Sequence, residues 1–406
     1  MKPGILLATT CRWPSAALLA LAFAENGSRV ELVCPQGHPA AHTRTAFRIH
    51  VFQRRAPLPS LRNAIEASEA DLIIPCDDEA MLSLHRLQSG LQTDSAAAAR
   101  VLDASFGTVE CHRIVDARSR LIDLARSEGI RVPETAAVAT VTELKDWLSR
   151  NRLPAVLKAD ESSGGVGVQN ILTDEAVELA FKRVTGPPAP VNAGPRTPFK
   201  PDSAPRRRGA AVNVQSFIEG RDATSSVACW KGEVVASIHC EVLKTLYSRG
   251  PASLLRLIDN HEMDNAARRL IKRLGLSGIH GFDFRLDVQT GNAYLIEMNA
   301  RATQISHLAM GPGRNLPAAL HAMLSGNAIP ETKPVAEKDV IALFPQEWNR
   351  DPSSEYLLSA YHDVPWREPR LVKYCVDNFL PHPKNAVQAH SKHLLRMLRE
   401  RTRQQR

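Results

Sequence analysis

Short apolar runs separated by an amphipathic segment open the chain. Residues 4–10, 29–33 and 71–75 are rich in Ile, Leu and Val and have the length of buried β-strands. Residues 15–26, between the first two runs, repeat apolar side chains at helical spacing and are followed by Gly27, a residue type common just after a helix. Strands that alternate with a helix predict a doubly wound α/β domain at the N-terminus.

Acidic residues follow the third of these predicted strands. Asp77, Asp78 and Glu79 come directly after residues 71–75, at the carboxyl end of a strand, where ligands bind in open α/β sheets. They equally suit the first turn of a following helix, which favours carboxylates. The sequence leaves both interpretations open. No Gly-x-Gly-x-x-Gly pattern follows the first strand, which argues against a dinucleotide-binding domain.

A second strand pattern carries polar side chains on one face. Residues 282–301 alternate apolar and polar side chains with a period of two, and the turn residues 289–292 divide them into a β-hairpin. A turn centred there sets Asp283 opposite Glu297 across the ladder, with Asn299 on the same face. Two carboxylates and an amide are therefore expected to converge.

Carboxylates that face each other repel unless a cation lies between them. A solvated outer face of the sheet is the ordinary interpretation of an acidic hairpin, whereas a hard cation such as Mg2+ prefers this set of oxygen ligands. Arg301 follows Asn299 by two residues and adds a donor that binds phosphate or carboxylate in a bidentate manner. This arginine favours the metal site.

A lysine followed by a glycine-rich loop has the composition of a phosphate-binding site. Lys158 ends a short apolar strand at residues 153–158, and residues 160–167 read Asp-Glu-Ser-Ser-Gly-Gly-Val-Gly. A cation beside closely spaced backbone N–H groups suits a phosphate. The loop does not match the Walker pattern, because no Gly-Lys-Ser/Thr follows, and a plain hairpin loop is the alternative.

Asp283 followed by Glu297-Met298-Asn299-Ala300-Arg301 resembles the signature of the ATP-grasp superfamily. Lys158 and the glycine-rich loop occur in the order and spacing that this family shows. The resemblance covers roughly residues 1–326. It implies ATP and Mg2+ (or Mn2+) as cofactors, with the metal held by Asp283, Glu297 and Asn299 and with Arg301 as the catalytic residue.

The resemblance also implies a set of ATP-binding residues. Arg118, on a helix expected over residues 110–132, replaces a lysine that family members carry about eleven residues before the glycine found here at position 129. Residues 212–218 resemble the hinge between the two lobes, where Gln215 stands at or next to a position that is usually Glu. The expected ATP-binding residues are Arg118, Lys158, Ser162, Ser163, Gly164, Gly165, Gly167, Gln215, Phe217, Ile218 and Asp222.

The expected fold class is a multidomain α/β and α+β protein. A doubly wound domain of the kind that precedes ATP-grasp cores is predicted over residues 1–110, and a two-lobed ATP-grasp fold over 111–326. Residues 186–209 contain seven prolines and are predicted to form a mobile insertion in the smaller lobe. Residues 327–406 are expected to form a C-terminal extension with a basic tail.

The reaction implied by the resemblance is ATP-dependent ligation of a small carboxylate to an amine or another nucleophile through an acyl phosphate. Lys244 and Arg249 lie in a segment, residues 239–251, that is expected to be a loop able to reach the substrate carboxylate, with simple surface exposure as the alternative. Two other functions stay open. One is a non-catalytic ATP-binding protein with this fold, and the other is a nucleic-acid-binding protein that uses basic segments.

Charge and cysteine content narrow these alternatives. The chain of 406 residues carries a net charge of +8, but residues 186–209 contribute +4 and residues 384–406 contribute +6, which leaves the remainder at −2. The folded body is therefore nearly neutral, and we expect no nucleic-acid partner. Seven scattered cysteines without a Cys-x-x-Cys pair suit a reducing cytoplasm, and no apolar run is long enough for a membrane span. A homodimer is compatible with this sequence.

Overall fold

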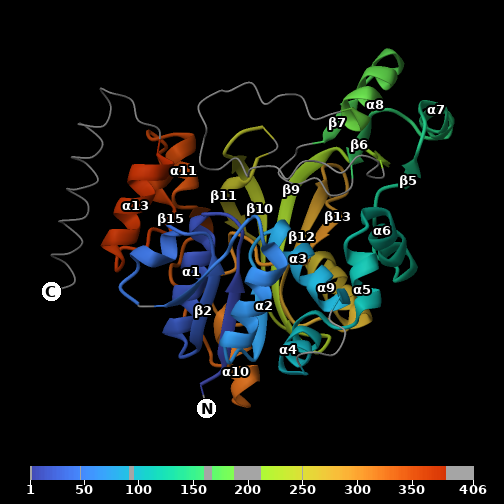
Figure 1. The fold of residues 1–406 in the computed structure, drawn as a ribbon. Coiled ribbons are helices and arrows are strands. Elements are labelled where there is room, and N and C mark those ends of the chain that lie inside the picture. The colour runs from blue at the N-terminus through green and yellow to red at the C-terminus, as the bar shows by residue number, and fades with distance from the viewer. Residues whose placement is uncertain are drawn as a thin grey trace.

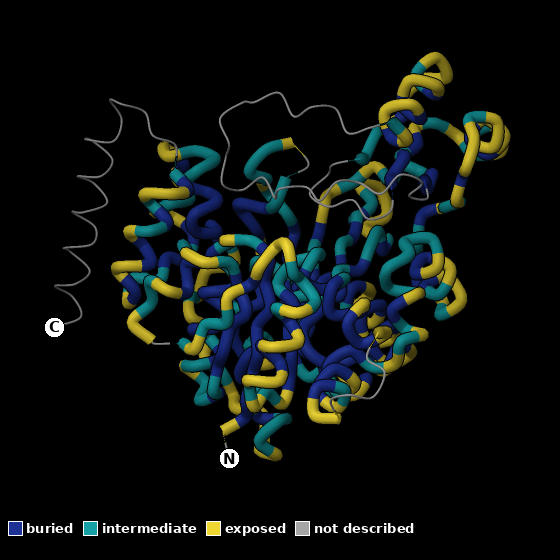
Figure 2. The backbone as a smooth tube through the Cα atoms, viewed as in Figure 1, coloured by how far each residue is buried: buried dark blue, intermediate teal, exposed yellow. Residues whose placement is uncertain are grey.

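The computed structural model describes residues 2–45, 47–90, 96–159, 167–186, 212–248 and 250–380. Within these residues the strands form three sheets, two of four strands and one of seven (Figure 1). Buried residues gather along the sheets, whereas the helices of the lobe that contains α7 and α8 carry many exposed residues (Figure 2). None of the helices in the described ranges is long and apolar enough to cross a membrane.

The N-terminal sheet is parallel and has the strand order β3-β2-β1-β4. Its strands are β1 (Gly4–Ala8), β2 (Arg29–Cys34), β3 (Arg48–Val51) and β4 (Leu72–Pro75). The helices associated with it are α1 (Pro14–Glu25), α2 (Pro57–Ala67), α3 (Asp78–Gly90) and α4 (Ala96–Phe106), and η1 (Pro39–His42) is a short 3-10 turn. Leu6 and Leu7 of β1 are both fully buried but in different hydrophobic clusters, because successive side chains point to opposite faces. The prediction of a doubly wound α/β fold is confirmed.

The seven-stranded sheet has the order β13-β12-β9-β10-β11-β14-β15. Its strands are β9 (Gly220–Trp230), β10 (Glu233–Thr245), β11 (Ala252–Leu257), β12 (Gly278–Asp287), β13 (Ala293–Asn299), β14 (Val340–Ala342) and β15 (Tyr361–His362). The helix α9 (His261–Leu274) packs on one face with side chains of β9, β12 and β13, and α10 (Leu316–Ser325) packs on the other beside α1. The N-terminal domain thus shares a core with the large sheet.

A small lobe projects from this body (Figure 1). Its antiparallel sheet has the order β5-β8-β6-β7. The strands are β5 (Thr135–Val138), β6 (Ala155–Ala159), β7 (Val168–Ile171) and β8 (Val212–Ser216), and the helical segments are α7 (Val141–Arg150), η2 (Asp174–Ala176) and α8 (Val177–Thr185). The insertion predicted over 186–209 lies between α8 and β8 and, apart from Gly186, outside the described residues.

The helix expected over residues 110–132 is two helices. They are α5 (Val109–Val115) and α6 (Arg118–Ser127), and Ala117 between them is extended, with φ −113° and ψ 107°. Asp116 ends α5, and its backbone N–H donates to His112 O at 2.8 Å. Its carboxylate forms a hydrogen bond of 3.0 Å with His85 Nδ1. The break matters because it makes Arg118 the first residue of α6, beside β13.

Two further segments differ from the sequence-based prediction. Residues 239–245 are not a loop but the second half of β10, which is interrupted by register shifts around Lys244. The residues expected to form a separate extension after 326 instead add β14 and β15 to the large sheet. The helices α11 (Gln346–Arg350), α12 (Tyr356–Ser359) and α13 (Pro369–Phe379) follow there, whereas the basic tail lies outside the described residues.

Candidate active site

A row of polar side chains crosses one face of the large sheet. Asp283 on β12 pairs directly with Glu297 on β13, as the sequence predicts, and with Thr224 on β9. The next pair in the same direction is Arg285 with Asp222. Residues paired across neighbouring strands point to the same face, so these side chains share one surface from β13 to β9.

Asn299 and Arg301 extend this row at the end of β13. Asn299 Nδ2 donates to Asp283 Oδ2 at 2.9 Å, which leaves its Oδ1 atom to accept from Arg301 Nη2 at 3.1 Å. The four residues predicted to bind metal and phosphate, Asp283, Glu297, Asn299 and Arg301, therefore lie together. This confirms that they converge, while their roles stay predictions.

The guanidinium of Arg301 has a second carboxylate partner, which the sequence did not predict. Arg301 Nε donates to Asp78 Oδ1 at 2.5 Å and Nη2 to Asp78 Oδ2 at 3.3 Å. Burial is the largest single effect and would lower the pKa of Arg301. The charge and the hydrogen bonds of Asp78, together with the charges of Asp283 and Asp77, outweigh it and hold this pKa above its ordinary value. The arginine is therefore permanently charged and held by the N-terminal domain.

Arg118 reaches the same site from the start of α6. Its Nη2 atom donates to Glu297 Oε2 at 2.7 Å, and its Nη1 atom to Ala159 O at 3.1 Å. One side chain therefore connects the hairpin of the large sheet to β6 of the small lobe. The position suits the phosphate-binding role that the resemblance implies for a lysine here, because arginine keeps the charge and adds a planar fork of donors.

Lys158 lies on β6 and is 8% exposed. Its Nζ atom donates to Gln215 Oε1 on the neighbouring strand β8 at 2.9 Å, and Gln215 Nε2 donates to Thr135 Oγ1 at 3.2 Å. Burial first, and then the charge of Arg118, lower the pKa of Lys158 to about 8. Gln215, predicted to contact adenine, is thus engaged with the lysine of the phosphate site.

The two facing carboxylates differ in their hold on a proton. Burial first, and then repulsion by Glu297, raise the pKa of Asp283. Burial has the same tendency at Glu297, but Arg118 and Lys158 outweigh it and lower the pKa of Glu297. Of the two carboxylates, Glu297 is therefore the one that ionises more readily, and Asp283 is the one that holds a proton more tightly.

The predicted hinge holds Phe217 and Ile218 between β8 and β9. Arg285 links them to Asp222: its guanidinium lies 5.5 Å from the centroid of the Phe217 ring, Nε donates to Ile218 O at 3.2 Å, and Nη1 donates to Asp222 Oδ1 at 2.7 Å. Sequence reasoning missed Arg285. Its position two residues after Asp283, on the same strand face, is the signal that could have found it.

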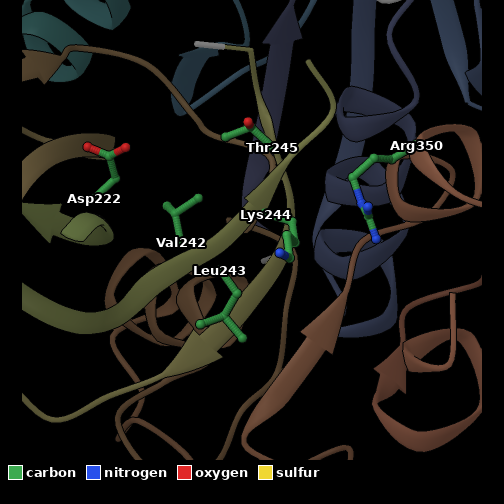
Figure 3. Close-up of a pocket in the computed structure, with 6 residues that line it drawn as sticks. All are labelled: Asp222, Val242, Leu243, Lys244, Thr245 and Arg350. Carbon is green, nitrogen blue, oxygen red and sulfur yellow. The ribbon is translucent and has the colours of Figure 1, made fainter. Parts of the chain in front are cut away.

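Lys244 and Asp222 line a cavity of about 390 Å3 together with Arg350 (Figure 3). Arg350 is already bonded to the buried Glu347, through Nε to Oε2 at 2.8 Å and Nη2 to Oε1 at 2.5 Å. Lys244 is exposed and makes no ion pair within 4 Å to any residue in the described ranges. It is therefore the cation of this cavity that is available to an anionic ligand.

The structure does not describe most of the glycine-rich loop that was predicted to bind phosphate. Ser162, Ser163, Gly164, Gly165 and Arg249 lie outside the described residues. Gly167, which ends the glycine-rich loop, has φ +79° and accepts the backbone N–H of Ala159 through its carbonyl at 3.2 Å. A left-handed backbone there suits glycine.

The oxygen atoms of Asp283, Glu297 and Asn299 fit a hard divalent cation. In the described part of the chain no three His, Cys, Asp or Glu side chains form a metal site by themselves. A cation at this hairpin would therefore depend on two carboxylates, an amide oxygen and further oxygen atoms from a ligand. Triphosphate oxygens are a ligand of that kind.

The fold and the position of this site are those of an ATP-grasp domain: a two-lobed body whose large sheet carries an acidic hairpin. Residues 122–304 match the family described as the ATP-grasp domain. This match identifies an ATP-grasp domain over residues 122–304, a little under half of the chain.

Solved structures with similar folds cover most of the chain. An N5-carboxyaminoimidazole ribonucleotide synthetase in complex with ADP aligns with a TM-score of 0.60 at 14% identity, over 83% of this chain and 81% of that one. The biotin carboxylase domain of the Hydrogenobacter thermophilus 2-oxoglutarate carboxylase, in complex with MgADP, ADP and bicarbonate, aligns with a TM-score of 0.58 at 16% identity, over 82% and 72%. At these identities the similarity establishes the fold.

A curated relative is acetyl-CoA carboxylase 2 of Oryza sativa subsp. japonica, 28% identical over 162 residues. The match covers 38% of this chain but only 6% of that protein. The chain therefore spans a small part of the length of the curated relatives that it matches.

Proposed function

We propose that this protein is an ATP-dependent ligase that joins a small carboxylate to an amine, or to another nucleophile, through an acyl phosphate. The observation that carries the proposal is the contact of two cations with the hairpin: Arg118 binds Glu297, and Arg301 binds Asn299. Transfer of a phosphoryl group needs positive charge on its oxygen atoms and little covalent help from the protein. This arrangement supplies that charge.

In the proposed reaction a carboxylate oxygen attacks the γ-phosphorus of ATP, and ADP leaves. The nucleophile then attacks the acyl carbon, inorganic phosphate leaves, and an amine loses its proton. Arg301 stabilises charge on the transferring phosphoryl group, while Arg118 and Lys158 hold the nucleotide phosphates. A Mg2+ ion held by Asp283, Glu297 and Asn299 would neutralise part of the phosphate charge when bound.

Nucleotide binding in this proposal extends along the same sheet face to the hinge. The ring of Phe217, the side chain of Ile218 and the backbone groups of both residues would contact adenine. The carboxylate of Asp222 would bind the ribose hydroxyls. Arg285 orients Asp222 through the 2.7 Å ion pair. Gln215 is assigned here to Lys158 rather than to adenine, because its amide oxygen already accepts from the Lys158 ammonium.

The carboxylate substrate is assigned to the cavity beside Lys244. Its volume of about 390 Å3 suits a small molecule, and its lysine lacks an ion-pair partner among the described residues. Arg350 borders the cavity but is neutralised by Glu347. The charge available to the substrate carboxylate is therefore that of Lys244.

A phosphate-release screen tests the function. The purified chain is incubated with ATP, MgCl2 and paired panels of amines and carboxylates, including amino acids, dicarboxylates and bicarbonate. We expect one pair to elicit ADP and phosphate together, and Glu297→Gln to abolish this turnover because it removes a charge from the proposed metal site.

Asp287→Asn is the matched control for this variant. Asp287 lies on the same hairpin, but its carboxylate binds only turn residues, accepting from Thr290 N at 2.7 Å. Its loss is expected to leave turnover within about twofold, because among the described residues its carboxylate bonds to Gln289 and Thr290 of the turn and to no residue of the proposed site. ATP binding without turnover on every pair would instead support a non-catalytic nucleotide-binding protein.

A further inference from the structure

The salt bridge between Asp78 and Arg301 connects two segments that are 223 residues apart in the chain. Asp78 is the first residue of α3 in the N-terminal domain, and Arg301 follows the end of β13. Both oxygen atoms of the carboxylate are used, by Nε at 2.5 Å and by Nη2 at 3.3 Å. Neither side chain is freely exposed, at 34% for Asp78 and 21% for Arg301.

The neighbouring residues hold Asp78 in place. Asp77 Oδ2 accepts from Thr10 N and from Thr9 Oγ1, both at 2.7 Å, and Asp77 Oδ1 accepts from Ala80 N at 2.9 Å. These bonds fix the start of α3 to the loop after β1. The capping interpretation of the acidic cluster holds for Asp77, the ligand-binding interpretation stays a prediction, and Asp78 contacts Arg301.

A backbone bond ties the arginine segment to the same strand end. Ala302 N donates to Pro75 O at 2.9 Å, so the residue after Arg301 is attached to the last residue of β4. The Asp78 carboxylate and the Arg301 backbone are therefore both anchored to the β4–α3 junction. A bidentate pair between two anchored groups restricts the many rotamers that an arginine side chain otherwise samples.

We propose that Asp78 is a positioning residue for Arg301, and that the N-terminal domain thereby completes the phosphoryl-transfer site. This inference rests on the proposed function. Asp78 leaves Nη1 of the guanidinium to other groups, since among the described residues Nη1 has only a long contact of 3.4 Å with Ala302 O. Nη2 already donates to both Asp78 and Asn299, so Nη1 is the nitrogen through which Arg301 can reach a transferring phosphoryl group.

Kinetics of Asp78→Asn test the proposal once a substrate pair is known. We expect kcat to fall by about ten- to a hundredfold while the KM for ATP changes less than about threefold, since misplacement of Arg301 affects the transition state more than nucleotide binding. Asp78→Glu keeps the charge and is expected to recover part of kcat. Glu79→Gln, which removes the adjacent charge without touching Arg301, is the control and should leave kcat unchanged.

A double-mutant cycle separates positioning from an independent role. In the Arg301→Ala background, Asp78→Asn is expected to lower kcat by less than about twofold, because the residue that it positions is gone. Equal effects in both backgrounds, or a loss confined to the KM of the amine, would overturn the proposal and favour direct substrate contact. Circular dichroism melting of each variant checks folding. Absence of turnover in the parent protein would overturn the proposed function and this inference together.

Discussion

Lys158 and Arg301 are both cations of the site, but their surroundings predict different effects on ATP. In the proposed function Lys158 contacts the phosphates of bound ATP before the reaction, and its burial lowers its pKa, whereas Arg301 is held at the end of β13 by Asp78. Interactions that strengthen in the transition state change turnover more than affinity.

The contrast gives a prediction for two variants. Arg301→Ala should lower kcat by about two to four decades, roughly 3 to 5 kcal/mol at about 1.4 kcal/mol per decade, with little change in ATP affinity. Lys158→Ala should weaken ATP binding by about ten- to a hundredfold. Calorimetric titration of ATP beside a phosphate-release assay measures both. Equal losses of affinity and rate in Arg301→Ala would remove its catalytic assignment.

For single residues, the sequence predicted which side chains of the hairpin come together, but not which side chains from other segments contact them. Asp283, Glu297 and Asn299 could be brought together because a short turn defines the register of a hairpin. The role of Asp78 could not be assigned, because its contact crosses between domains. The strand pattern could have placed Arg285 on the face of Asp283, but not its contact with Ile218 at the hinge. Neither contact follows from local periodicity.

Strand β9 approaches β12 closely where the hinge enters the large sheet. A Cβ atom on Gly220, the first residue of β9, would lie 2.0 Å from the carbonyl oxygen of Leu286 on β12. That neighbour is backbone and cannot rotate away. The two strands can keep their present spacing only with glycine at this position.

Gly220→Ala is therefore expected to destabilise the protein by about 1 to 3 kcal/mol, as overpacking does in a well-packed interior. Gly90→Ala at the end of α3 is the matched control, because a Cβ atom there meets nothing within 4 Å. Urea unfolding of both variants measures the difference in free energy. An unchanged midpoint for Gly220→Ala would show that β9 can move without loss of stability.

Among the elements, those with strong local patterns were predicted well. The hairpin of β12 and β13 follows from period-two alternation and turn residues, and the strands of the N-terminal sheet follow from short apolar runs. The break between α5 and α6 did not follow, because the apolar spacing continues across Asp116 while a tertiary contact with His85 holds that residue. β10 was underestimated because its second half contains a bulge.

The hydrophobic core of the whole molecule includes residues after position 326. Strand β14 pairs with β11, and Phe344, Leu371 and Phe379 are almost fully buried in the cluster shared with the N-terminal domain. The expected boundary at residue 326 rested on the absence of recognisable chemistry beyond it. A segment without predicted site residues can still contribute side chains to the hydrophobic core.

A chain that ends at residue 326 is expected not to fold. Each large apolar side chain removed from the core costs about 1.5 to 3 kcal/mol, and several together exceed the 5 to 15 kcal/mol that stabilises a typical domain. A chain that ends at residue 380 keeps every one of these contacts and should melt close to the parent temperature. A cooperative melt of the shorter chain would contradict this prediction.

Buried histidines predict sensitivity to mild acid. Burial lowers the pKa of His38 to about 3 and the pKa values of His112 and His280 to about 4, from an ordinary value of 6.5. The unfolded chain therefore binds protons there below pH 6.5 while the folded chain does not. Their contribution to stability is complete above that pH and is lost as the pH falls towards 4.

At pH 5 each such histidine is expected to lower stability by at most about 2 kcal/mol relative to neutral pH. Melting curves at pH 7.5 and pH 5.0 should show a clear drop in Tm. His280→Gln should flatten the pH dependence, because one of the groups is removed. Identical Tm values at both pH values would show that these side chains do not limit stability.

The ion pair between Arg118 and Glu297 bears on the order in which ligands arrive. The guanidinium occupies a Glu297 oxygen that a divalent cation would need, and Lys158 and Arg301 add like charge nearby. The oxygen atoms of a triphosphate would accept hydrogen bonds from Arg118 in place of Glu297. Their negative charge would also offset the positive charge of the three cations around the hairpin. Magnesium is therefore expected to enter as a complex with the nucleotide: MgCl2 alone should give no binding heat, whereas Arg118→Met should create measurable affinity for the free ion.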